Sequence, residues 1–504
     1  MPCATMSGKT RDAIQRRPLS FSYTAGGDSG ESNVPLLPPD MPRTIHRATL
    51  TVLERTGVIM RSETVLSALH DAGALVDGDT MRVRFPGDMV EAAVAKAPRG
   101  FTLCARDPRM DLPIDGNHGY LSMDGCGCEI LDLETGERRP STRQDVVLAT
   151  RLADALSEIA FVWQPVAARD CPPETQSLHE IHAQLENTTK HIQCMTAVTQ
   201  AAARGVVEMA EAVAGGSAQL RERPLISSFQ CSLSPLCYDR EPLEAALVFA
   251  RAGIPCGFVT MPMACATAPA TVAGTLVISN AEVLAGMVAL QTLVPGAPAF
   301  YGACPTVMDL RTGAAACGGP EDALLQVACA RMARWYGIPS SIGTFASGAK
   351  ESGWQAGVEN VLSGMASYIG RADMMSGAGL LYSARTFAFE QMVMDAEVFG
   401  HIVHFFQGLS CSDDDLAVEV IEKVGPGRHF LAERHTRRQM RRLWNPTLFA
   451  RQSWEEWEAA GKPAPAETAR ARARAIIREH KPEPLDDRLS AELLQIIRSY
   501  EERV

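Results

Sequence analysis

Three polar side chains lie in two loops whose composition suits binding and chemistry. Asp309 follows an apolar run and a short loop, and Lys350 and Gln355 lie in a long Gly-rich loop and the helix that it enters. A lysine can pair with a substrate carboxylate, and carboxylate and amide groups can hold or orient a substrate. We predict these three as the catalytic residues, although an isolated acid on a loop often only shapes its turn.

Aromatic side chains recur at or near the ends of several apolar runs. Aromatic faces attract quaternary ammonium groups by cation–π attraction of about 0.5 to 2 kcal/mol each. Core packing also accounts for any single ring, but the combination favours a cage around a cation. The residues predicted to bind substrate are Trp163, Phe229, Gln230, Tyr301, Phe345, Trp354 and Tyr382.

These residues need a scaffold that brings distant segments to one rim. Between residues 119 and 383, a short apolar run, a Gly-rich or polar turn and a helical stretch recur eight times. Strands that alternate with helices pair in parallel, and eight units close a (β/α)8 barrel, which reacts at the C-terminal ends of its strands. The runs are residues 120–124, 160–164, 191–195, 225–229, 256–260, 299–302, 341–344 and 374–377.

The predicted fold class is therefore α/β, a (β/α)8 TIM barrel with an addition at each end. Residues 1–34 are rich in Ser, Gly, Thr and Arg and predict a disordered leader. Residues 35–110 predict an N-terminal α/β cap, residues 111–408 the catalytic barrel, and residues 409–504 a C-terminal helical extension.

Composition excludes several classes of function. The net charge of −11 argues against a nucleic-acid partner. No apolar run approaches the roughly 18 residues that a membrane span needs, and the first residues lack the apolar core of a secretory signal. We expect a cytoplasmic protein without a membrane partner.

Most of the fourteen cysteines lie inside apolar runs, so we predict reduced, structural thiols. Cys126 and Cys128 form the only close pair, and no second pair stands at the spacing of zinc ligands. A single reactive thiol at the barrel end, Cys265 or Cys304, is the alternative.

One helical face carries Glu397, His401 and His404, which resembles half of a metal site. Their apolar neighbours favour packing on the barrel, and we predict no metal. The sequence also lacks the motifs of nucleotide-binding loops, zinc proteases and serine hydrolases.

Several separated segments resemble the trimethylamine:corrinoid methyltransferase family. The resemblance covers about residues 36 to 500 and implies a barrel that moves a methyl group from a methylated amine to the cobalt of a separate corrinoid protein. The segments are residues 132–140, 261–319, 347–359, 390–397, 424–427, 435–436 and 444–446.

The family has two branches. Archaeal trimethylamine enzymes carry pyrrolysine in the barrel, whereas many bacterial relatives lack it and are associated with quaternary amines such as glycine betaine. This chain contains only standard residues and so resembles the second branch. It differs in the loop after the seventh strand, where the family pattern has acidic residues and this chain has Gly348 and Gly353.

The resemblance implies a small methylated-amine substrate and a corrinoid protein as partners. We expect no tightly bound cofactor, with cobalamin supplied by that partner, because the chain lacks an Asp-x-His-x-x-Gly segment that would ligate cobalt. A quaternary amine leaves as a neutral tertiary amine, so no general acid is required. The alternatives are a demethylase with another acceptor, such as a folate, and a non-catalytic betaine-binding barrel; a homo-oligomer is compatible with each.

Overall fold

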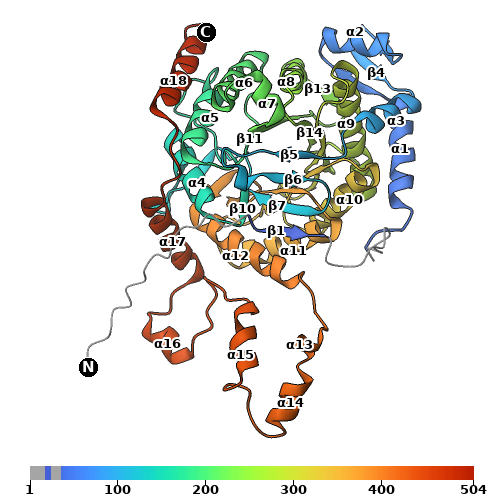
Figure 1. Ribbon diagram of the computed structural model, residues 1–504. Coiled ribbons are helices and arrows are strands. Elements are labelled where there is room, and N and C mark those ends of the chain that lie inside the picture. Colours follow the sequence, from blue (N-terminus) through green and yellow to red (C-terminus); the bar gives the residue numbers. More distant parts are fainter. Residues whose placement is uncertain (1–17, 24–35, 126, 504) are drawn as a thin grey trace.

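The computed structural model describes residues 18–23, 36–125 and 127–503. Eight parallel strands form a closed barrel inside a ring of helices (Figure 1), and the last strand, β20, pairs with the first, β7. All eight predicted runs coincide with barrel strands, so the predicted fold is confirmed. In order around the barrel, the strands are β7 (His118–Ser122), β10 (Ile159–Trp163), β11 (Ile192–Cys194), β12 (Ile226–Cys231), β14 (Cys256–Thr260), β16 (Ala299–Ala303), β19 (Ser340–Gly343) and β20 (Met374–Ser376).

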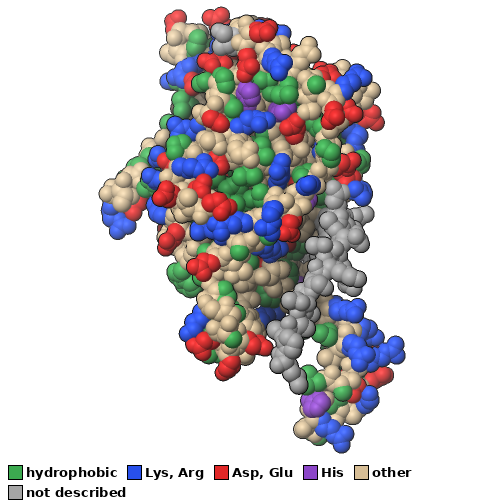
Figure 2. Space-filling model, turned by 90° about the vertical axis from the view of Figure 1, so that its left-hand side faces the viewer, with side chains coloured by type: hydrophobic (Ala, Val, Ile, Leu, Met, Phe, Trp, Pro, Cys, Tyr) green, Lys and Arg blue, Asp and Glu red, His purple; other side chains and the backbone are tan. Residues whose placement is uncertain are grey.

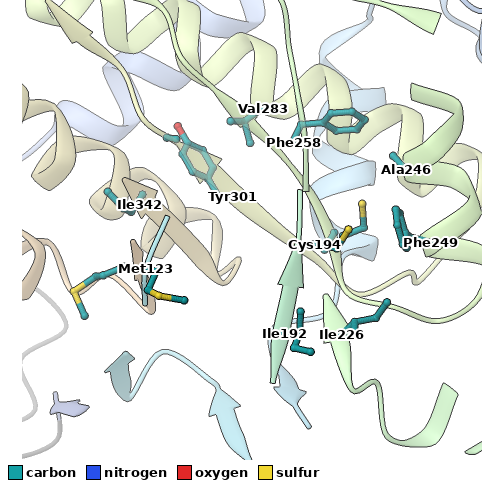
Figure 3. Close-up of a cluster of buried hydrophobic side chains, with 14 of the residues drawn as sticks. Met123, Ile192, Cys194, Ile226, Ala246, Phe249, Phe258, Val283, Tyr301 and Ile342 are labelled. Atoms are coloured by element: carbon teal, nitrogen blue, oxygen red, sulfur yellow. The ribbon is translucent and has the colours of Figure 1, made fainter. Parts of the chain in front are cut away.

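Helices follow the strands and cover the outside of the barrel. Outward-facing strand residues pack against them: Figure 3 shows Cys194 and Phe258 in one apolar layer with Phe249 of a covering helix. Successive strand residues point to opposite faces, so every second residue joins this layer and the others point inward. The covering helices are α4 (Arg143–Ala155), α5 (Gln176–Asn187), α6 (Gln200–Ala214), α7 (Ser217–Glu222), α8 (Arg240–Arg251), α9 (Val272–Leu293), α10 (Pro320–Tyr336), α11 (Trp354–Gly370) and α12 (Phe389–Phe405).

A hairpin closes the end of the barrel where the strands begin. β5 (Phe101–Leu103) and β6 (Leu112–Ile114) pair antiparallel just before the first barrel strand. Their apolar side chains share one buried cluster with inward residues of the strands, including Tyr120, Phe161 and Phe300. The interior is therefore open to chemistry only from the C-terminal ends of the strands.

A small α/β unit precedes the barrel. α1 (Met41–Arg55) and α3 (Gly87–Lys96) pack on α9. The two-residue strand β13 (Cys237–Tyr238), from the loop after β12, joins its sheet. The elements are α1 (Met41–Arg55), β2 (Val58–Met60), α2 (Glu63–Asp71), β3 (Leu75–Asp77), β4 (Arg82–Arg84) and α3 (Gly87–Lys96). The division of the chain into domains stays a prediction.

The expectation of a disordered leader is wrong for residues 18–23. β1 (Ser20–Ser22) pairs antiparallel with β7, Phe21 is buried, and the Tyr23 hydroxyl donates to the Ala372 carbonyl at 2.6 Å. β1 pairs with residues 118–120 of β7, ahead of the residues that pair with β10, and its aromatic side chains favour a strand there. The rest of the predicted leader lies outside the described residues.

The C-terminal helices return to the barrel wall. α17 (Pro465–Glu479) packs on α12 and α4, and α18 (Asp487–Glu501) packs on α6 and α5. Arg470 of α17 donates to the buried Glu390 of α12 at 2.6 Å. This pairing anchors the end of the chain to the last barrel helix.

Within the described residues, α9 is the one helix long and apolar enough to cross a membrane. Most of it is buried in the protein, between the barrel and helices α1, α3 and α10. Its apolar character is therefore that of a core helix.

Gly343 of β19 lies so close to the Cys304 side chain that only glycine fits at this position without a shift. A Cβ atom at Gly343 of β19 would lie 2.2 Å from the Cys304 sulfur and 2.9 Å from its Cβ. We expect Gly343→Ala to lower the free energy of unfolding by about 1 to 3 kcal/mol through overpacking. The double variant Gly343→Ala, Cys304→Ala should recover part of the loss in denaturant melts.

Gly357 of α11 provides the matched control, because nothing lies within 4 Å of the position that a Cβ atom would occupy there. Gly357→Ala should stabilise the protein by up to about 1 kcal/mol, since alanine favours a helix more than glycine does. If Gly343→Ala and Gly357→Ala changed the free energy of unfolding equally, the close contact between Gly343 and Cys304 would be contradicted.

Candidate functional site

Two aromatic side chains meet inside the barrel near the C-terminal ends of its strands. Trp163 is the last residue of β10, and Phe229 lies on β12. Their ring centroids are 4.6 Å apart with planes inclined by 48°, and both belong to the inward cluster. The sequence predicted both as substrate-binding residues, and the structure brings them together.

A polar side chain lies beside this pair. Gln193 of β11 is the register partner of Trp163 on the adjacent strand and is fully buried. The indole Nε1 of Trp163 and both polar atoms of the Gln193 amide have no hydrogen-bond partner among the described residues. Buried polar groups are normally paired, because an unpaired one costs about 1 to 3 kcal/mol. These unpaired groups near the C-terminal ends of the strands are therefore candidates for hydrogen bonds to a ligand.

A carboxylate stands at the mouth where the barrel closes. Asp124 follows β7, accepts from its neighbour Gly125 N–H at 2.6 Å, and accepts from the Ser376 hydroxyl of β20 at 3.4 Å. Burial, and secondarily the charge of Asp124, raises the pKa of Cys231 to about 12, and the same causes raise that of Cys304 well above its usual value. The thiols of this region are thus neutral at pH 7, and its charge is carboxylate charge.

Two further acids fix the loops after β16 and β19. Asp322 of α10 accepts from Gly318 N–H at 3.0 Å, and burial raises its pKa to about 6. Glu359 of α11 accepts from the Ser347 hydroxyl at 2.5 Å and from Gly348 N–H at 2.9 Å. These acids give the rim a defined backbone, and no side-chain ion pair to either acid occurs among the described residues.

The predicted catalytic residues lie on the outer rim, away from Trp163. Asp309 forms an ion pair with Arg311 at 2.9 Å and accepts from its backbone N–H, which holds its pKa at about 2 and shapes an exposed turn. Gln355 donates to Glu359 at 2.8 Å. Lys350 is exposed, and its Nζ stands 4.5 Å from the centre of the Tyr382 ring. Their catalytic roles stay predictions.

Four residues predicted to bind substrate point away from the interior. The Tyr301 hydroxyl donates to Asn280 of α9 at 3.0 Å, so its ring lies between strand and helices. Phe345 is buried against α11 and α12, with Phe399 at 6.4 Å. Gln230 donates to the Ala197 carbonyl at 3.3 Å on the face of β12 opposite Phe229. Trp354 points to solvent and is 87% exposed.

The sequence reasoning missed Asp124 and Gln193. Asp124 was visible as the last residue of the first apolar run, and Gln193 as the polar residue of a run whose neighbours, Ile192 and Cys194, are apolar. The twofold alternation of strands would have placed both inside the barrel. It would also have placed Tyr301 outside, since Phe300 and Gly302 flank it.

A closed parallel barrel with aromatic, amide and carboxylate side chains at the strand ends defines a (β/α)8 enzyme. Two crystal structures share this fold: a hydroxylamine complex of MtmB and the Methanosarcina barkeri monomethylamine methyltransferase (MtmB). Each has a TM-score of 0.51, covers 89% of both chains, and is 12% and 11% identical in sequence respectively.

Sequence comparison gives the family. The family described as trimethylamine methyltransferase (MTTB) matches residues 10–503. The trimethylamine methyltransferase MttB of Desulfitobacterium hafniense is 36% identical over 91% of this chain and 92% of its own, and that of Methanosarcina barkeri is 32% identical over 92% and 94%. A glycine betaine methyltransferase of D. hafniense is 34% identical over 92% and 96%.

The protein is therefore a methyltransferase, and it belongs to the trimethylamine methyltransferase family. The resemblance inferred from its separated sequence segments is confirmed.

The position of Tyr301 predicts a structural role. Tyr301→Ala should lower the free energy of unfolding by roughly 3 to 5 kcal/mol, as large-to-small changes of buried aromatic residues do. Tyr301→Phe should cost only about 1 kcal/mol, for the lost bond to Asn280. Tyr382→Ala at the rim is the control and should melt close to the wild type. If Tyr301→Ala had normal stability and failed to bind substrate, the Tyr301 ring would be part of the substrate site instead of the core.

Asp322 predicts a pH dependence. Its folded-state pKa of about 6 exceeds the unfolded value near 4. The stability that it contributes is therefore full below about pH 4 and is lost as the pH rises through about 6. Relative to Asp322→Asn, the wild type should lose up to about 3 kcal/mol of unfolding free energy between pH 4 and pH 7.

Denaturant melts of both proteins across this range provide the measurement. Asp309→Asn is the control, because the Asp309 pKa is held at about 2 and the carboxylate stays ionised throughout. A flat difference between the wild type and Asp322→Asn would refute the raised pKa.

Proposed function

We propose that this protein moves a methyl group from a quaternary ammonium substrate with a hydrogen-bond acceptor, such as a betaine, to the reduced cobalt of a separate corrinoid protein. The observation that carries this proposal is the pair formed by Trp163 and Gln193, whose buried polar atoms face an aromatic barrel interior. The relatives include both trimethylamine and glycine betaine methyltransferases, so the residues of this site decide between the two substrates.

The interior suits a cation that has no N–H group. The ring faces of Trp163 and Phe229 can each attract a quaternary ammonium by about 0.5 to 2 kcal/mol. The carboxylate of Asp124 adds long-range attraction from the mouth, where the neighbouring thiols of Cys231 and Cys304 stay neutral. Neither interaction requires the substrate to donate a hydrogen bond.

The polar pair selects among such cations. The Trp163 indole can only donate, and the Gln193 amide can donate or accept. A betaine carboxylate would accept from both, whereas tetramethylammonium and trimethylammonium offer no acceptor and would leave them unpaired. Sites built around hydrogen bonds discriminate strongly against ligands that lack the matching group.

The proposed reaction requires no proton transfer to the leaving group. The bond between a methyl carbon and the ammonium nitrogen breaks, its electron pair stays on nitrogen, and a neutral tertiary amine leaves. The corrinoid would supply the nucleophile that provides the electron pair for the new bond. The barrel contributes desolvation of the cation and alignment of one methyl group toward the mouth.

The rim suits the approach of a large acceptor. The loops after β14 and β16 carry the small residues 264, 266, 268 and 314–316, all alanine, around the opening. Small side chains let a flat macrocycle come close to a methyl group held inside. We place the reaction in the cytoplasm, since the twelve described cysteines carry free thiols, which suit a reducing compartment.

Methyl transfer from glycine betaine to a reduced corrinoid protein, followed by absorbance, tests the proposal. We expect turnover with the corrinoid protein, and a colourless purified protein that binds little free cobalamin. Turnover with a folate and no cobalt would identify the alternative acceptor. Betaine binding without transfer to either acceptor would identify a non-catalytic barrel.

Two substitutions test the polar pair. Trp163→Phe keeps an aromatic face and removes the N–H donor, and Gln193→Met removes the amide at similar volume. We expect each to raise KM for glycine betaine about tenfold, equivalent to a hydrogen bond of about 1.4 kcal/mol, and to leave KM for tetramethylammonium unchanged. Gln230→Met, on the outer face of β12, is the control. Equal effects on both substrates would show that the pair does not read the acceptor group.

A further inference from the structure

A segment between α12 and the C-terminal helices projects beyond the barrel. Residues 407–443, called the arm below, leave the end of α12 and form α13 (Asp413–Leu416), α14 (Val418–Val424), α15 (Arg434–Gln439) and the 3-10 turn Met440–Arg442. Figure 1 shows the arm projecting away from the barrel helices. The structure describes the whole arm, and Val424 is its single buried residue.

Polar contacts hold the arm in a defined shape. Asp414 accepts from Arg438, Asp415 accepts from Arg442 at 2.7 Å, and Lys423 donates to Glu433 at 2.7 Å. Helices of four to seven residues are not stable on their own. The arm thus pairs its charged groups internally while it lacks an apolar core.

The large apolar side chains of the arm face outward instead. Leu409 and Leu431 are 92% and 83% exposed, so neither contributes to a core within the chain. The other exposed apolar side chains of the arm are Leu416, Val418, Ile421, Phe430, Met440 and Leu443.

A second exposed apolar surface lies on the neighbouring barrel helix. α11 exposes Trp354, Val358, Val361 and Leu362, at positions i, i+4, i+7 and i+8 of one helical face. The outer face of a barrel helix is normally polar, yet Gln355 is the only other exposed residue of α11. Phe405, exposed at the end of α12 where the arm begins, adds one more exposed apolar side chain next to the arm.

We propose that the arm of one copy of this chain packs on the α11 face of a second copy, and reciprocally. A twofold axis would let each copy cover both apolar surfaces of the other. These thirteen side chains offer on the order of 1,000 Å² per copy, more than the roughly 800 Å² that each partner gives to an interface of standard size.

Charge also favours a second copy. Arg434, Arg437 and Arg441 of the arm form no ion pair with the described residues, and the whole chain carries a net charge of −11. Glu351, three residues before the exposed Trp354, is an exposed acid on the receiving side and follows the exposed Lys350. A hollow of about 740 Å³ between α14 and α15, lined by Leu416, Val418 and Arg434 among others, can accept partner side chains.

A transient partner would not keep the two apolar surfaces covered. An acceptor protein that must dissociate in every cycle would leave both surfaces in water for much of the time. A second copy is present whenever the chain is, and obligate interfaces of this kind are the more apolar ones.

Light scattering of the full-length protein after size exclusion, without substrate, tests the proposal. We expect a mass of at least twice the 54.3 kDa of one chain. Two double variants, Val358→Glu with Leu362→Glu on α11, and Leu409→Glu with Leu431→Glu on the arm, should each lower the mass toward one chain. Leu75→Glu, at an exposed leucine of β3, is the control and should keep the wild-type mass.

The arm variant also guards against misfolding, because the substituted leucines contribute nothing to the core, and circular dichroism should match the wild type. A monomeric wild-type protein would overturn the proposal. An unchanged mass in either folded double variant would show that arm and α11 do not pair between copies.

Discussion

The alternation of side chains in a closed parallel barrel is the constraint on which the rest of the structure depends. Because β20 pairs with β7, no strand has a free edge, and each inward residue faces the others across one shared interior. Phe258 and Tyr301 therefore pack against the covering helices. The side chains of Trp163, Gln193 and Phe229 point into the barrel interior. The hairpin of β5 and β6 fills the entry end of the strands and so fixes the mouth at the other end.

Burial sets the electrostatic character of that interior. Thiols removed from water keep their protons, as Cys231 and Cys304 do, while Asp124 is held by a backbone N–H and a hydroxyl from the adjoining strand. A region with carboxylate charge and aromatic faces favours a cation and has no strong acid to offer. This combination agrees with a reaction whose leaving group needs no proton.

The sequence was sufficient for the barrel and insufficient for much of the site. The eight apolar runs mark strands because each lies between turn residues and a helical stretch, and this local pattern survives folding. Tyr301 was misplaced because aromatic character alone does not distinguish the two faces of a strand, whereas alternation with Phe300 and Gly302 does. Phe345 follows β19 and packs against α11 and α12, which its residue type does not show. Asp309 forms an ion pair with Arg311, two residues away. The residue type of an acid does not show whether it pairs with such a local partner or faces the site.

The arm and the mouth impose different demands, and the barrel separates them. α12 follows the last strand and runs back from the mouth, so the arm begins at the end of the barrel that the hairpin closes. An apolar surface that must stay covered and an opening that must exchange partners would conflict if they coincided. The α11 face begins at Trp354, after the rim loop that follows β19, so a permanent assembly must leave the loops after β14 and β16 free for an acceptor that binds and leaves.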